Sequence, residues 1–235
     1  MKILGIESSG LTASIAVWQD DMIIAEYTTN FKKTHSETLL PMIAEVLERI
    51  NIDVNEMDYI AVSEGPGSFT GLRIGAATAK GLGLATGKEL VSVPTVEALA
   101  YNLYNVQGVI CPIMDAKRDQ VYTGIFEYED GELKTLFNTD AVAITEIIDK
   151  INGFGKEVTF LGDGVPVYKD VINDSIKVPC HYAPANLAYQ SAASVCVLAA
   201  KMVKEGKVVG ADMMRPEYLR LSQAERERME KEKNL

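Results

Sequence analysis

The chain has 235 residues, of which 47% are hydrophobic and 24% charged, so it is long enough for one large globular domain or two small ones. Its net charge of −10 argues against strong binding of nucleic acid by this chain alone, because phosphates are bound mainly by basic surfaces. If RNA is involved, another chain has to supply most of the affinity for phosphate.

Membrane and export signals are not evident in the sequence. Its apolar runs fall short of the roughly 18 residues of a membrane span, and the first ten residues lack the apolar core of a signal peptide. Cys111, Cys180 and Cys196 are scattered and do not show CxxC spacing. We therefore expect a cytoplasmic protein with reduced thiols, no membrane association and no zinc site.

The first half of the chain alternates strands and helices. Short apolar runs predict strands, and apolar residues spaced by three and four predict helices. In chain order we expect strands at 2–7, 13–20 and 23–29, a helix at 37–50, a strand at 58–63, a helix at 70–86, a strand at 90–93 and a helix from about 95.

The helix expected at 37–50 has one apolar face and an uncertain start. Thr34 and Glu37 have the spacing of a capping box, but Pro41 is comfortable only in a first turn, which favours a start nearer Thr38. The apolar face comprises Leu39, Leu40, Ile43, Val46, Leu47 and Ile50.

The second half repeats this order. Strand-like segments at 109–114, 121–128 and 132–138 are followed by a helix at 144–151, a strand at 157–161 and a long helix at 187–206. Three strands, a helix, a strand and a helix thus occur twice. We predict two α/β lobes of βββαβα order, at residues 1–104 and 105–221, and a charged tail at 222–235 that is either a solvated helix or a docking segment.

A glycine-rich turn, SEGPGSFTGLRIG at 63–75, joins a predicted strand to a predicted helix. It lacks the Lys-Ser/Thr pair of a Walker A loop, and its glycine spacing and position differ from the Rossmann fingerprint. Anion binding at the helix N-terminus remains open on these grounds, although neither nucleotide motif is present.

The helix after this turn carries small residues every four positions: Gly71, Gly75, Ala79, Gly83 and Gly87. Each glycine inside a helix costs about 1 kcal/mol relative to alanine, so the stripe indicates close packing against something. The partner is the protein's own sheet, a helix of another subunit, or a ligand.

Two polar segments occupy corresponding places in the two halves. Glu7, Ser8 and Ser9 lie in the turn after the first strand, where actin-like ATPases hold phosphate, although turn formation alone also explains them. In the second half, the segment 115–119 contains Asp115 and Arg118. It forms either an interlobe ion-pair network or a surface run of charge.

Histidine chemistry is not supported by the sequence. His35 and His181 are the only histidines, and they are far apart. Neither has a second histidine at metal-binding spacing, so we predict no metal site and no catalytic histidine.

The sequence resembles the TsaB (YeaZ) family, the non-catalytic partner in bacterial tRNA threonylcarbamoyladenosine synthesis. The resemblance is carried mainly by GPGSFTGLRIG at 65–75, and more weakly by other segments in the same order. These are GIESSGLTASIAV, HSETLLPMI, MDAKRDQVY, LGDGVPVY and RPEYLR.

The resemblance implies an RNase H-like, actin-like ATPase superfamily fold for both lobes. A related catalytic family, TsaD, binds its metal through two histidines four residues apart. Thr95 and Leu99 stand at those positions here, and leucine cannot bind a metal. The resemblance therefore implies a non-catalytic subunit, without a cofactor, that pairs with a TsaD-like catalytic subunit and helps to recruit a TsaE-like ATPase. It contacts tRNA only within that complex.

The resemblance also implies that the stripe of small residues takes part in pairing with the catalytic subunit. We predict a four-helix contact with TsaD, or with a second copy when the chain is alone. Its residues are Leu39, Ile43, Leu47, Gly71, Arg73, Gly75, Ala79 and Gly83. A stand-alone phosphotransferase of the actin fold, with nucleotide between the lobes near Glu7 and Asp115, is the alternative function; a peptidase is a weaker one.

Overall fold

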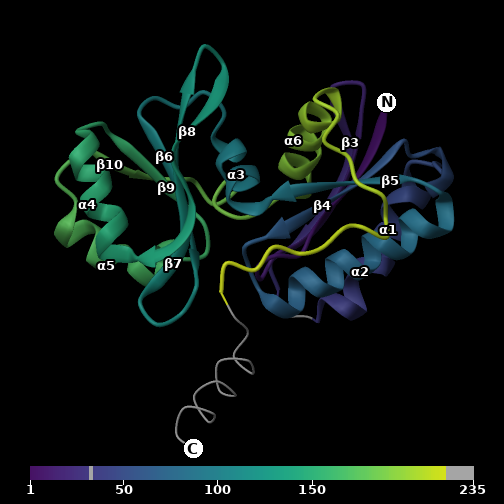
Figure 1. Ribbon diagram of the computed structural model, residues 1–235, viewed down its shortest axis with the longest axis horizontal. Helices are drawn as coiled ribbons and strands as arrows, with labels where there is room; N and C mark the ends of the chain where they lie inside the picture. Colours follow the sequence, from purple (N-terminus) through teal and green to yellow (C-terminus); the bar gives the residue numbers. More distant parts are fainter. Residues whose placement is uncertain (32–33, 221–235) are drawn as a thin grey trace, which may run out of the picture.

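The computed structural model describes residues 1–31 and 34–220, and it contains two lobes that are each built on a five-stranded mixed sheet (Figure 1). The strands are β1 (Lys2–Glu7), β2 (Ala13–Gln19), β3 (Met22–Thr29), β4 (Tyr59–Gly65), β5 (Glu89–Pro94), β6 (Val109–Asp115), β7 (Gln120–Glu129), β8 (Glu132–Ala143), β9 (Val158–Leu161) and β10 (Cys180–Tyr182). The α-helices are α1 (His35–Arg49), α2 (Phe69–Thr86), α3 (Thr95–Ala100), α4 (Ile144–Phe154), α5 (Val165–Ser175) and α6 (Ala192–Lys204), and the 3₁₀ helices are η1 (Val54–Glu56) and η2 (Tyr101–Leu103).

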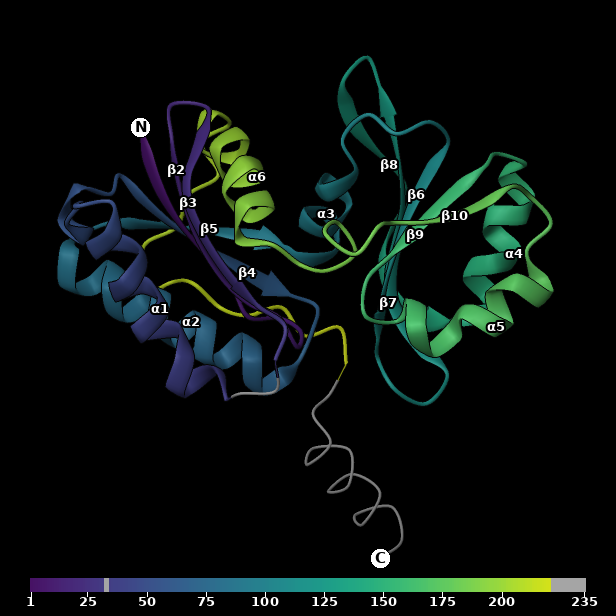
Figure 2. The ribbon, with the colours of Figure 1, turned by 180° about the vertical axis from the view of Figure 1, so that it is seen from behind.

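The first sheet has the strand order β3-β2-β1-β4-β5, and helices cover both of its faces. Successive side chains of a strand point to opposite faces. Leu4 and Ile6 therefore join the core under α1 and α2, whereas Ile3 joins the core under α6. Figure 2 shows α6 on one side of this sheet and the helix pair α1 and α2 on the other.

The second sheet has the order β10-β9-β6-β7-β8, which repeats the arrangement of the first. In both lobes the first three strands form antiparallel neighbours, and the next strand pairs in parallel with the first. The repeated βββαβα order predicted from the sequence is thereby confirmed. α4 and α5 cover one face of this sheet, and α3 and η2 contribute to the apolar cluster on the other.

Two helices of the second half differ from the prediction. Helix α5 was not among the predicted elements, which pass from the strand at 157–161 to the helix at 187–206. Pro166 in fact lies in the first helical turn, where its missing N–H is not needed. Helix α6 begins at Ala192 rather than at 187, because the Ser191 side chain caps it by accepting from the Ala193 N–H at 3.0 Å.

The predicted extent of the second lobe, 105–221, also needs correction. The predicted boundary near residue 104 does lie between the last strand of the first sheet and the first strand of the second. However, α6 packs on β1 and β2, and residues 209–217 return to the first lobe as well. The prediction assigned α6 to the second lobe by its place in the chain, whereas the strands it packs on, β1 and β2, lie near the start of the sequence. The predicted tail at 222–235 lies outside the described residues.

The start of α1 agrees with the earlier of the two predicted positions. The helix begins at His35, Thr34 is its N-cap residue without a side-chain cap bond, and Pro41 lies inside it. No helix among residues 1–31 and 34–220 is long and apolar enough to span a bilayer.

Candidate functional site

The glycine turn is built against the hairpin that follows β1. The Ser68 N–H donates to the Ser9 carbonyl oxygen at 2.6 Å, and the Ser68 hydroxyl accepts from the Gly71 N–H at 3.3 Å. A Cβ added at Gly67 would overlap the Ser9 carbonyl oxygen. The turn therefore needs glycine because two backbone segments meet there.

The small stripe of α2 faces the chain's own sheet, so the predicted interface needs correction. A Cβ added at Gly71 would overlap the Ser8 carbonyl oxygen, and one added at Gly75 would overlap the Ser8 hydroxyl. Ala79 is fully buried, and Gly83 leaves room for Leu90 and Ala211. Intrachain packing thus accounts for the stripe from Gly71 to Gly83, which was one of the alternatives open from the sequence. Gly87 ends the helix as its C-cap residue, with a φ of +70°.

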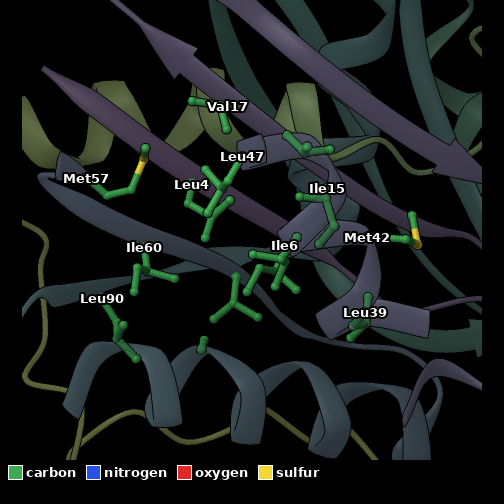
Figure 3. Packing of buried hydrophobic residues seen from close by; sticks show 14 of the residues in the cluster. Leu4, Ile6, Ile15, Val17, Leu39, Met42, Leu47, Met57, Ile60 and Leu90 are labelled. Atoms are coloured by element: carbon green, nitrogen blue, oxygen red, sulfur yellow. The ribbon is translucent and has the colours of Figure 1, made fainter. Parts of the chain in front are cut away.

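The apolar residues assigned to the interface on α1 are also part of the core. Leu39, Ile43 and Leu47 are buried against the first sheet. Figure 3 shows Leu39 and Leu47 in the same packed cluster as Leu4 and Ile15. A lone lobe covers this face by itself, because the sheet beneath it is apolar as well.

The opposite face of the helix pair is exposed and carries apolar and small residues. Leu40 on α1 is 55% exposed, and Leu84 on α2 is 67% exposed. Ala77 and Gly81 are exposed on α2, as is Arg73. We call these five residues the outer face. Arg73 is thus the predicted interface residue that this arrangement leaves accessible.

The hairpin residues Glu7, Ser8 and Ser9 are buried. Glu7 Oε1 accepts from the Ser9 N–H at 2.6 Å and from the Ser9 hydroxyl at 2.5 Å. Burial raises the pKa of the Glu7 carboxyl, and the bonds from Ser9 oppose that rise. Glu7 therefore holds the hairpin in shape.

A cleft of about 750 Å³ separates the lobes on one side of the molecule. It is lined by Ser9 from the first lobe and Asp115 from the second, whereas the other residues proposed for an interlobe site, Glu7, Ser8 and Arg118, do not line it. Its wall comprises Ser9, Gly10, Leu11, Pro66, Gly67, Ser68, Phe69, Met114, Asp115, Ala116, Lys117, Tyr122, Asp163, Val167, Glu217, Tyr218, Leu219 and Arg220.

The charges in the cleft do not favour the phosphates of a nucleotide. Lys117 is paired with Asp115, and Arg220 donates to the backbone carbonyl of Ala116. Asp163 and Glu217 add two further carboxyl groups. The cations that line the described cleft thus already have partners, and its acidic groups repel anions.

Sequence reasoning missed Asp163 and the segment 217–220 as parts of the cleft. The Asp115 N–H donates to Asp163 Oδ1 at 3.2 Å, and burial raises the pKa of Asp163. Gly162 places Asp163 there, since its φ of +105° strains any side chain and an added Cβ would overlap the Ile113 carbonyl oxygen. The two glycines of LGDG were the available signal for a close backbone contact, but the residue they approach, Ile113, lies about 50 positions earlier in the sequence.

Thr95 and Leu99, the two positions that the resemblance matched to metal-binding histidines, have structural roles here. Thr95 is fully buried, and its hydroxyl accepts from the Gly65 N–H at 3.1 Å. Leu99 is 1% exposed and belongs to the apolar cluster between the lobes. Among the described residues, no group of three or more His, Cys, Asp and Glu side chains is placed to hold a metal ion.

Comparison with known proteins places these features in a family. A family model described as TsaD, tRNA N6-adenosine threonylcarbamoyltransferase, matches residues 22–228. The tRNA threonylcarbamoyladenosine biosynthesis protein TsaB of Bacillus subtilis is 32% identical, over 99% of this chain and 100% of that protein. Its Escherichia coli counterpart is 26% identical over 94% of this chain and 95% of that protein.

A solved structure shows the same fold. YeaZ from Pseudomonas aeruginosa superimposes with a TM-score of 0.76, covers 93% of this chain and 99% of its own, and is 22% identical. The two mixed sheets and their helices form a two-lobe α/β fold of the actin-like type. On the identity and coverage of the Bacillus subtilis relative, the chain belongs to the TsaB (YeaZ) family.

Proposed function

We propose that this chain is a non-catalytic subunit in the biosynthesis of tRNA N6-threonylcarbamoyladenosine. It pairs with a TsaD-like catalytic subunit and helps to recruit a TsaE-like ATPase, and it contacts tRNA only within that assembly. The names of its relatives support the pathway, and the match to the TsaD model supports a shared scaffold.

The observation that supports the non-catalytic role is the structural role of the Thr95 and Leu99 side chains. Both side chains are buried and engaged within the chain, one with the glycine turn and one between the lobes. A leucine has no ligand atom, and a threonine hydroxyl is a poor ligand for transition metals. The chain thus retains the scaffold without the side chains for the relatives' metal chemistry.

Gly81 supports the outer face as the pairing surface. An added Cβ at Gly81 would meet nothing within 4 Å, whereas Gly71, Gly75 and Gly83 have neighbours within the chain. A glycine inside a helix lowers the stability of the helix by about 1 kcal/mol relative to alanine, and at Gly81 no close contact within the lobe compensates for this loss. A glycine at this position would let a helix of another subunit pack closely against α2, and the exposed side chains of Leu40 and Leu84 would bury apolar area in the same contact.

The remaining parts of the proposal follow from charge and thiol chemistry. The net charge of −10 assigns tRNA affinity mainly to other subunits. The three cysteines are unpaired thiols, which suits a cytoplasmic location. In the absence of the catalytic subunit, the outer face pairs with a second copy of this chain.

The test is a bulky substitution on the outer face with a matched control in the other lobe. Gly81→Arg fills the outer face of α2, and Gly153→Arg makes the same change on α4, where an added Cβ also meets nothing within 4 Å. We expect Gly81→Arg to lose self-association and pairing with the TsaD-type protein of the same organism. Light scattering during size-exclusion chromatography measures both, and a melting curve checks folding.

Two outcomes would count against the proposal. If Gly81→Arg and Gly153→Arg pair with the TsaD-type protein as well as the unmodified chain does, the outer face is not the interface. If the purified chain alone turns over ATP robustly, and Asp115→Asn abolishes that turnover, a stand-alone phosphotransferase is favoured instead.

A further inference from the structure

The two lobes are joined tightly on one side of the molecule. Helix α3 follows the last strand of the first sheet and packs on β6 and β7 of the second. Val96 and Leu99 of α3 lie in one buried cluster with Phe126 and Leu161 of the second lobe. A domain motion in a two-lobe protein takes place about such a junction, so the opposite side determines how far the lobes can separate.

The segment after α6 runs along the first lobe toward that opposite side. Val209 pairs with Leu90 at the open edge of β5, through N–H to oxygen distances of 2.8 and 2.9 Å. Met214 is buried in the core, and the Lys80 ammonium donates to its carbonyl oxygen at 3.4 Å. Figure 1 shows this yellow segment passing from α6 beside β5 and then along α2 toward the gap between the lobes.

Glu217 and Tyr218, near the end of the described chain, contact the glycine-rich turn and the start of α2. The Glu217 N–H donates to the Glu64 carbonyl oxygen at 2.7 Å. The Tyr218 ring lies 4.6 Å from the Phe69 ring, and its hydroxyl accepts from Arg73 Nε at 3.2 Å. The segment is therefore fixed to the first lobe up to Tyr218.

The next contact crosses to the second lobe. The Arg220 guanidinium donates to the carbonyl oxygen of Ala116 and, at 3.4 Å, to that of Lys117. These carbonyls lie in the β6–β7 hairpin, where residues 117–119 all have positive φ. Residues 217–220 also form one wall of the cleft. The segment thus spans the mouth of the cleft, opposite the α3 junction.

We propose that residues 215–220 form a clasp that sets the separation of the two lobes, with Arg220 joining the clasp to the β6–β7 hairpin and Tyr218 anchoring it on the first lobe. When the Arg220 contact is lost, the lobes rotate apart about the α3 junction and the cleft widens. This device does not depend on the proposed role in tRNA modification, because it involves contacts within one chain.

The clasp is tested by measuring a distance between the lobes in the full chain. Spin labels at Met22→Cys, on β3, and Asp149→Cys, on α4, report that distance, because both positions are exposed. The partly exposed Cys180 is changed to serine in every sample, whereas Cys111 and Cys196 are buried. Samples are diluted with unlabelled protein so that double electron–electron resonance reports distances within one chain.

We expect Arg220→Gln to broaden the distance distribution and move it to longer distances. Tyr218→Ala should do the same by freeing the other end of the clasp. Arg215→Gln is the matched control, because the Arg215 guanidinium donates within the segment, to the carbonyls of Asp212 and Met214. Melting curves show that each variant is folded, which we expect because none of the three residues is buried.

The proposal fails on either of two results. One is that Arg220→Gln and Tyr218→Ala both keep the distribution of the unmodified chain. The other is that Arg215→Gln widens the distribution as much as Arg220→Gln does, because the effect would then not arise from the bond between the lobes.

Discussion

The carboxyl group of Glu64 makes the stability of the folded chain depend on pH. Glu64 lies at the start of the glycine-rich turn, and burial together with the nearby charge of Glu217 raises the pKa of Glu64 from 4.5 to about 7. The folded chain therefore binds more protons than the unfolded chain between these two values. Stability consequently falls as the pH rises through that window.

Glu64→Gln should remove this dependence on pH. The variant is expected to gain stability relative to the unmodified chain as the pH rises from 5 to 8, by on the order of 2 kcal/mol after allowing for partial exposure of the carboxyl group. Urea unfolding at several pH values measures the difference, and Glu48→Gln, at an exposed site on α1, is the control. Parallel stability curves for Glu64→Gln and the unmodified chain would contradict the assignment.

At the scale of one element, α2 shows that glycine has two different uses on the same helix. Gly71 lets the helix approach the Ser8 backbone, whereas Gly81 lies against open space. The first kind of glycine is required by the fold. The second kind lowers the stability of the lone chain, since glycine is a poor helix former.

The same substitution should therefore have opposite effects at these two positions. Gly71→Ala is expected to lower the free energy of unfolding by about 1–3 kcal/mol or more, because the added Cβ overlaps a backbone carbonyl that cannot easily move. Gly81→Ala is expected to raise it by up to about 1 kcal/mol through helix propensity. Thermal and urea unfolding compare the two variants, and effects of the same sign would contradict this account of α2.

At the scale of the whole molecule, the two lobes share a junction at α3, a cleft opposite it and a strongly acidic composition. The acidity extends into the cleft through Asp115, Asp163 and Glu217. Phosphates are therefore repelled both at long range and within the cleft.

The isolated chain should accordingly bind tRNA only weakly. We expect no submicromolar binding at physiological salt, and we expect binding to appear when the TsaD-type protein is added. Filter binding or fluorescence anisotropy across a series of salt concentrations measures this. Submicromolar binding by the chain alone would show that a local basic surface outweighs its overall charge.

The sequence by itself determined the order of the elements and much of the local chemistry. Alternating and helical periodicities predicted the repeated βββαβα order, and α2 was expected at 70–86 and found at Phe69–Thr86. The side chains of Thr95 and Leu99 are unsuited to binding a transition metal in any fold, because this property belongs to the residue itself. These features are local, so local patterns suffice to predict them.

The tertiary structure decided which surfaces face inward and which lobe each late element joins. The stripe at Gly71, Gly75 and Gly83 indicates that something packs closely against α2. The sequence does not show that Gly71 and Gly75 face Ser8, which is distant in the chain, or that Gly83 faces Leu90 of β5. The return of α6 and of residues 209–217 to the first lobe likewise depends on long-range pairing. A spacing in the sequence records that a face must be covered, whereas only the packed chain shows what covers it.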